Sequence, residues 1–227
     1  MNNTVNLLNG LELLYPENTV IAQMKRTLDM FPESEPYLVD AFSLGQLKSK
    51  LWLIDNLPDN LGLVFICAGW YGTLASLMFD RARNKFDKIR SFDVDPTCAP
   101  IADNFNRSYV IDGWQFKAST MDILNMSYPT SYTTYRANKT SVDLTEMPDT
   151  IINTSCEHIH NFSAWYDKIP QGKVVILQSN DFIDVDEHVN CYQSVDHFDN
   201  SVNMSKTLFV GELPLQKYTR FMKIGIK

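Results

Sequence analysis

The sequence predicts an α/β protein with a doubly wound, mostly parallel sheet of about seven strands. The sheet is expected to end in an antiparallel hairpin and to carry a helical cover at its N-terminus. From residue 61 onward, short apolar runs alternate with helical patterns, as parallel strands with helical crossovers require. The first run leads through a glycine-containing turn into a helix. The last two runs, residues 206–211 and 218–226, alternate in polarity and favour a terminal hairpin.

Length and composition fit one compact unit. The chain has 227 residues, of which 44% are hydrophobic and 21% charged, and these are ordinary globular values. We divide it into a helical cover, residues 1–60, and a sheet domain, residues 61–227. The net charge of −7 argues against a nucleic-acid partner, because non-specific binding needs a basic face.

Several features bear on location. No apolar run approaches the ~20 residues of a membrane span, and the N-terminus shows no secretory signal. The four cysteines are scattered and are interpreted as free thiols in a reducing compartment. These observations predict a cytoplasmic protein without a membrane partner. The sequence does not indicate an oligomeric state.

The first 60 residues carry helical patterns. One helix is expected to open at residues 16–18 and to close at Pro32, and a second helical region covers residues 35–56, with a break near residues 43–45. Packing on the sheet is the expected role of most of these residues. Three side chains of this region are candidates for lining a pocket: Gln46, Lys48 and Trp52.

Residues 61–96 organise the rest of the chain. An apolar run, residues 61–67, suits a strand buried on both faces. The turn that follows, residues 68–72, contains two glycines, and the missing Cβ lets a backbone approach a ligand closely. A helical pattern begins at Thr73.

A second strand, residues 88–94, ends beside two carboxylates, Asp93 and Asp95. A carboxylate at the tip of this strand is where nucleotide-binding folds hold ribose hydroxyls. A helix over residues 97–107 and a third strand over residues 114–118 are expected next.

Residues 125–146 are rich in Tyr, Ser and Thr and have no clean period, which predicts a long loop or an inserted excursion. Four of its side chains could line the binding pocket of a substrate or belong to a solvent-exposed flap: Tyr128, Tyr132, Tyr135 and Arg136.

The fourth strand, residues 148–154, is followed by the best catalytic candidates. Glu157 and His158 come directly after it, with Asn153 and Ser155 nearby. Ligands of parallel sheets bind outside the carboxyl ends of the strands, and Glu or His there could remove a proton from an acceptor. The alternative is a helix start favoured by the Glu157 charge.

A helix over residues 162–169 and a buried fifth strand over residues 174–178 precede an acidic, aperiodic segment. Its acids, histidines and lone cysteine match no zinc spacing and no calcium loop, so no metal site is predicted. Three residues of this segment are instead candidates for contact with a substrate: Asn180, His188 and Asn190. The alternative interpretation is that they belong to a solvent-exposed loop.

In element order, residues 61–227 resemble the class I S-adenosylmethionine (SAM)-dependent methyltransferases, a Rossmann-like family. The resemblance implies SAM as cofactor. Its glycine turn would pass under the methionine part, its acid after the second strand would hold the ribose, and residues after the third strand would enclose the adenine. The implied cofactor-binding residues are Ala68, Gly69, Trp70, Gly72, Asp93, Asp95, Met121, Asp122, Ile123, Thr154 and Ser155.

The chain departs from the family pattern at three positions of the first strand and turn. Ile66 stands where an acid is usual, and Ala68 and Trp70 stand where glycines are usual. For Asp122, a helix N-cap is an equally good interpretation and is compatible with adenine binding.

The resemblance implies methyl transfer to a small-molecule or metabolite acceptor, at a nitrogen or oxygen nucleophile. The chain lacks the Asn/Asp-Pro-Pro-aromatic tetrad of enzymes that methylate base amines, and it lacks a Pro-Cys nucleophile. Glu157 and His158 are the implied catalytic residues. Three alternatives stay open: transfer of the aminocarboxypropyl arm of SAM, non-catalytic binding of an adenosine ligand, and a nicotinamide oxidoreductase.

Overall fold

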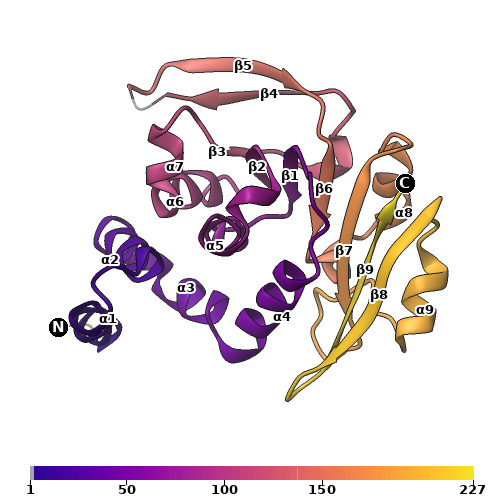
Figure 1. Cartoon of the computed structure of the whole chain (residues 1–227), viewed down its shortest axis with the longest axis horizontal. Helices are drawn as coiled ribbons and strands as arrows, with labels where there is room; N and C mark the ends of the chain where they lie inside the picture. The colour runs from indigo at the N-terminus through magenta and orange to yellow at the C-terminus, as the bar shows by residue number, and fades with distance from the viewer. Residues whose placement is uncertain (1–2, 137) are drawn as a thin grey trace.

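The computed structural model describes residues 3–136 and 138–227. Within these residues seven strands form one sheet in the order β3-β2-β1-β6-β7-β9-β8 (Figure 1). The first five are parallel, β9 runs antiparallel to β7, and β8 pairs antiparallel with β9 at the edge. The predicted sheet and its terminal hairpin are therefore confirmed. The strands are β1 (Leu63–Cys67), β2 (Lys88–Asp93), β3 (Phe116–Thr120), β6 (Thr150–Asn153), β7 (Val174–Asn180), β8 (Lys206–Pro214) and β9 (Thr219–Ile226).

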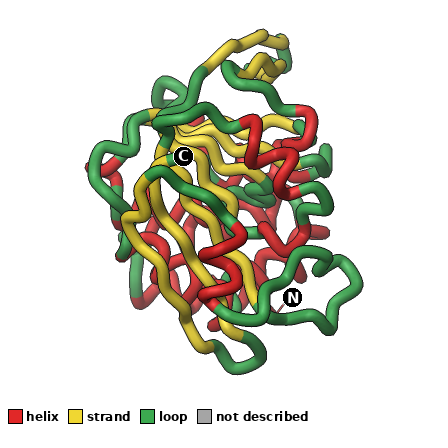
Figure 2. The backbone as a smooth tube through the Cα atoms, turned by 90° about the vertical axis from the view of Figure 1, so that its right-hand side faces the viewer, coloured by secondary structure: helices red, strands yellow, loops and turns green. Residues whose placement is uncertain are grey.

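Helices cover both faces of this sheet, as Figures 1 and 2 show. They are α1 (Asn3–Leu14), α2 (Thr19–Met30), α3 (Glu35–Ala41), α4 (Leu44–Asp55), α5 (Thr73–Arg81), α6 (Cys98–Phe105), α7 (Arg107–Ile111), α8 (Phe162–Lys168) and α9 (Val195–Ser201). No helix in the described part of the chain is both long and apolar enough to cross a bilayer.

Alternate residues of β1 belong to two separate cores, as the two-residue period of a strand requires. Val64 and Ile66 pack with side chains of α4, α5 and α6. Phe65 and Cys67 pack on the opposite face with side chains of α8 and α9. Burial on both faces explains why this strand appears in the sequence as a continuous apolar run.

The N-terminal helices form an outer layer. A third cluster joins α1, α2 and α3 to α6, with Leu28, Leu38 and Phe105 at its centre. Helix α2 begins where the sequence predicts, because the Asn18 side chain accepts a hydrogen bond from the Ile21 N–H at 3.0 Å. This layer brings α3 and α4 over the carboxyl ends of the strands.

The segment expected as a loop over residues 125–146 is instead an antiparallel hairpin of β4 (Thr130–Tyr135) and β5 (Ser141–Glu146). In Figure 1 it lies above β3 and β2, with α5 and α6 below them. Buried Arg90 fixes the hairpin to β2: its Nε and Nη2 donate to the Glu146 carboxylate at 2.8 and 3.0 Å, and its Nε also reaches Tyr132 Oη at 3.0 Å. The loop prediction failed because the inward residues of β4 are themselves polar or amphipathic.

Three further boundaries differ from the sequence prediction. Strand β3 lies two residues later than expected, because Gly113 and Trp114 adopt positive φ values of 60° and 54° in the preceding turn. Strand β7 extends to Asn180. The acidic segment after β7 contains a short helix, α9, whose first turn is capped by the Ser194 hydroxyl.

Candidate active site

A cavity of about 460 Å³ lies at the carboxyl edge of the parallel strands, within the usual size range of small-molecule sites. Its walls come from the turn after β1, the tip of β2, the segment after β6, and residues of β7 and β9, while α3 and α4 cover it. The family resemblance implies a cofactor at this position. A larger cavity, of about 870 Å³, lies between α6, β3 and the β4–β5 hairpin.

The turn after β1 has the shape of a glycine turn although two of its residues have side chains. Ala68 and Trp70 adopt positive φ angles of 56° and 49°, which cost an L-residue roughly 1–2 kcal/mol each. Gly72 has a φ of 68° and precedes α5. At Gly69 a Cβ would lie only 2.1 Å from Ser91 Oγ, so this position must be glycine for the turn to rest on β2.

Asp93 fixes this turn from the tip of β2. Its Oδ2 accepts the Trp70 N–H at 2.8 Å, and its Oδ1 accepts the Asp95 N–H at 3.1 Å. Each carboxylate oxygen has a further lone pair. Asp93 lines the cavity and can therefore accept hydroxyl protons from a ligand while it keeps the turn in place.

The structure brings together six of the predicted cofactor residues and separates the others. On the cavity wall are Ala68, Gly69, Trp70, Asp93, Thr154 and Ser155. Away from it, Gly72 begins α5, and exposed Asp95 accepts the Thr97 backbone and hydroxyl protons, both at 2.8 Å.

The predicted adenine residues also spread out. Met121 lines the larger cavity. Asp122 caps a 3₁₀ turn, accepting the Leu124 N–H at 2.9 Å, which is the N-cap alternative. Ile123 is buried in the core under α8. The apolar side chain at the cavity beside Asp93 is instead Val94, which is 67% exposed.

Glu157 is buried on the opposite wall, with 4% of its side chain exposed. Its Oε1 accepts hydrogen bonds from Arg220 Nη1 at 2.7 Å and from Asn180 Nδ2 at 2.8 Å. Asn180 is itself oriented, because its Oδ1 accepts the Phe182 N–H at 2.9 Å. The sequence predicts Glu157 and Asn180 as site residues, whereas Arg220 was missed because its partner lies 63 positions away.

Two cavity-lining residues have a buried polar atom with no hydrogen-bond partner among the described residues, Glu157 Oε2 and Arg220 Nε, and Asn153 Nδ2 at the end of β6 is another such atom. Unsatisfied buried polar atoms are rare in folded proteins, and their concentration at one edge of a cavity is typical of a functional site.

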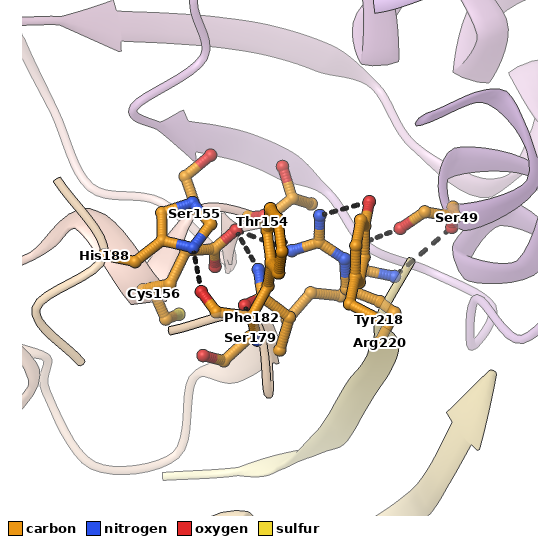
Figure 3. A network of polar contacts seen from close by, with 12 residues as sticks. Ser49, Thr154, Ser155, Cys156, Ser179, Phe182, His188, Tyr218 and Arg220 are labelled. Carbon is orange, nitrogen blue, oxygen red and sulfur yellow. Dashed lines mark hydrogen bonds and ion pairs between the residues drawn. The ribbon is translucent and has the colours of Figure 1, made fainter. Parts of the chain in front are cut away.

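His158 and His188 meet at the rim. Their rings lie edge to face, with centroids 4.6 Å apart. Burial lowers the pKa of His158, opposed by the Glu157 carboxylate and assisted by His188, so its imidazole is neutral at pH 7. His188 Nδ1 donates to the Phe182 carbonyl at 2.5 Å, a bond that Figure 3 draws. Asn190, the third predicted acceptor residue, donates to the Cys156 carbonyl at 3.2 Å and supports the loop.

Lys50 is a second cation that sequence reasoning missed. It is buried in α4, where its Nζ donates to the Ala41 carbonyl at 3.0 Å and to Gln46 Oε1 at 3.2 Å. Burial, with a contribution from the Arg220 charge, lowers the pKa of Lys50 to about 7. Ser49 beside it donates to Gln178 Oε1 at 3.0 Å, so α4 is tied to β7 across the cavity. Of the three candidates predicted in this region, Gln46 lines the cavity.

Solved structures share the fold of this chain. The N-methyltransferase NodS from Bradyrhizobium japonicum WM9 superposes with a TM-score of 0.56 and 10% identity, over 82% of this chain and 98% of NodS. The fold is that of the class I SAM-dependent methyltransferases. The CurJ carbon methyltransferase, at 12% identity, covers all of this chain and 72% of its own with a TM-score of 0.54.

A geranyl diphosphate methyltransferase in complex with GPP and sinefungin also has this methyltransferase fold, with a TM-score of 0.53 and 12% identity over 79% of this chain and 78% of that one. No protein-family model and no curated protein sequence matches the chain. The likeness therefore lies in the fold.

Proposed function

We propose that the chain is a SAM-dependent methyltransferase that acts on a nitrogen or oxygen nucleophile of a small-molecule acceptor. The observation that carries this proposal is the coincidence of Asp93 and the strained turn with the cavity at the carboxyl edge. Neighbours of the same fold were solved with SAM or its demethylated product S-adenosylhomocysteine (SAH) bound, at TM-scores of 0.51 and 0.55.

The residues present fit such a ligand. In this proposal Asp93 accepts ribose hydroxyls, and the exposed face of Val94 packs against the adenine ring. In this proposal the methionine part runs along the turn of Ala68, Gly69 and Trp70, which lines the cavity. When bound, SAM would supply an electrophilic methyl group: an acceptor lone pair would attack the methyl carbon in line as the carbon–sulfur bond breaks, and SAH would leave.

The wall after β6 would bind the acceptor and remove its proton. His158 is neutral at pH 7 and lines the cavity, so in this proposal it takes the acceptor's proton. Buried Glu157 is engaged by Arg220 and Asn180 and acts as a positioning residue for this edge. In this proposal the turn after β1 and the tip of β2 bind the cofactor, and the segment after β6 contacts the acceptor during methyl transfer.

The test is calorimetric titration with SAM and SAH, with NAD as comparison. We expect micromolar binding of SAM and SAH and none of NAD. At 100 times its dissociation constant, SAH should stabilise the fold by about 2.7 kcal/mol. The absence of heat and of a thermal shift with both SAM and SAH would contradict the proposal. Mass spectrometry of the products then separates methyl transfer from transfer of the aminocarboxypropyl arm.

Once an acceptor is known, His158→Asn should bind SAH normally but lower turnover by ~10²–10⁴-fold, the usual contribution of a positioned base. The matched control is His160→Asn, an exposed histidine two residues further along. Equal turnover of wild type and His158→Asn between pH 6 and 9 would remove His158 from the reaction.

A further inference from the structure

Three groups that bind metals in other proteins meet at the rim of the cavity. Glu157 and His158 follow β6, and His188 comes from the loop after β7. One ligand atom of each lies within 4.8 Å of the other two. The sequence predicts no metal site because the spacing along the chain fits no template, whereas the fold joins positions 30 residues apart.

One oxygen of the Glu157 carboxylate accepts two hydrogen bonds, and the other has no hydrogen-bond partner among the described residues. Arg220 and Asn180 both donate to its Oε1, which fixes the plane of the group. Its Oε2 is buried and has no partner among the residues that the structure describes. A carboxylate oxygen can only accept, so either a donor or a cation would relieve the loss of hydration.

Both histidines are oriented through hydrogen bonds to backbone carbonyls. A carbonyl cannot donate, so His188 carries a proton on Nδ1, where it bonds Phe182 O at 2.5 Å, and Nε2 is the nitrogen left to bind a metal ion. The His158 ring donates to the backbone of Glu187. Carbonyl partners of this kind fix the tautomer and direction of metal-binding imidazoles. Figure 3 shows the hydrogen bond that joins His188 to Phe182.

We propose that Glu157 Oε2, His158 and His188 Nε2 bind one divalent transition metal ion of the Zn²⁺ class. Two imidazoles and one carboxylate are the donors of catalytic zinc sites that keep a position open. Magnesium and calcium prefer oxygen ligands throughout, which this set does not supply. Zinc bond lengths place tetrahedral donors roughly 3.4 Å apart, so the three ligand atoms would move closer together when the ion binds.

The neighbouring residues determine the expected metal affinity and the side on which the open coordination position lies. The Arg220 charge lies on the far oxygen of Glu157 and opposes a cation, so the affinity should be weaker than that of closed structural zinc sites. Glu157 and His158 line the cavity, so the open coordination position faces it. The next part rests on the proposed function: an acceptor oxygen or nitrogen at that position would lose its proton more readily. His158 would then act as a ligand, and as the base only in the metal-free chain.

The experiment is Zn²⁺ titration of the full, metal-stripped chain by calorimetry, with Co²⁺ absorption as a check on coordination. We expect one ion per chain, no competition from excess Mg²⁺, and at least tenfold weaker binding in His188→Asn and in His158→Asn. His160→Asn is the matched control and should bind as wild type does. Failure of the wild type to bind Zn²⁺ or Co²⁺, or unchanged affinity in His188→Asn, would overturn the proposal.

SAH titration of the same samples keeps the two proposals apart. Binding of SAH without Zn²⁺ binding overturns the metal site and leaves the methyltransferase proposal intact. Binding of Zn²⁺ without SAH binding supports the metal site and contradicts the proposed function. Far-ultraviolet circular dichroism of each variant confirms that a change in affinity is not a loss of fold.

Discussion

The two walls of the cavity are built by different means. The wall at β1 and β2 is mostly backbone: Ala68 and Trp70 hold positive φ angles, and Asp93 receives two backbone N–H groups. The wall at β6, β7 and β9 is made of buried side-chain charge, with Glu157 and Arg220 each 4% exposed. Side chains on the wall at β1 and β2 can be replaced at a smaller cost in folding, because the backbone gives that wall its shape. On the other wall the same buried side chains line the site and stabilise the fold, so a substitution there alters both function and stability.

The comparison predicts where substitutions should act. A change of a cavity-facing side chain on the backbone wall should weaken ligand binding more than it lowers the free energy of unfolding. A change on the charged wall should first lower the free energy of unfolding. Substitutions of Arg220, Lys50 and Asp93 test this contrast.

Arg220→Met should have the largest effect, because it removes the partner of buried Glu157. Breaking one side of a buried ion pair costs about 3–5 kcal/mol of stability. Urea unfolding measures the loss. Arg81→Met is the control, since Arg81 is exposed and its ion pair with Asp80, at 3.6 Å, lies on the surface. A loss below about 1 kcal/mol for Arg220→Met would show that the pair is not a structural element, since exposed pairs fall in that range.

Lys50 should make stability depend on pH. Its folded-state pKa is lowered to about 7 from 10.5 by burial and by Arg220, so between these values the unfolded chain holds a proton that the folded chain lacks. Stability therefore rises with pH across this window and is lost as pH falls. The difference in unfolding free energy, wild type minus Lys50→Met, should increase by about 2 kcal/mol between pH 7.5 and 9.

Lys48→Met is the matched control for this titration, because Lys48 is an exposed lysine on the same helix. Its difference from wild type should stay flat over the same range. A flat profile for Lys50→Met as well would mean that Lys50 is charged in the folded chain.

Asp93→Ala tests the backbone wall. Loss of a carboxylate that accepts ribose hydroxyls should weaken SAH binding at least tenfold, or about 1.4 kcal/mol, since charged hydrogen bonds contribute this much. Asp95→Ala should bind SAH as wild type does, because the Asp95 carboxylate is engaged by Thr97. The opposite pattern would move the ribose contact two residues along the chain.

The sequence predicts the sheet well where one strand is buried on both faces, as at β1 and β7, because such strands appear as continuous apolar runs. It fails at the β4–β5 hairpin, where Thr130, Tyr132 and Thr134 face inward and give no apolar contrast with their neighbours. Tyr132 can be buried because its hydroxyl reaches Arg90 and Glu146, and no local pattern indicates such a network.

The same limit applies to the site. Asp93 could be predicted because the turn, helix and strand around it form one local motif. Arg220 and Lys50 could not, since their positions depend on contacts between distant strands and helices. The metal-binding set also arises only when the loops after β6 and β7 meet.

The most direct test of the account is a crystal structure of the chain with SAH. We predict that the SAH ribose hydroxyls lie within hydrogen-bond distance of the Asp93 carboxylate, with the sulfur directed toward His158. This is the result expected if the backbone wall binds the cofactor and the charged wall meets the acceptor. SAH bound instead in the 870 Å³ cavity between β3 and the β4–β5 hairpin would contradict the account.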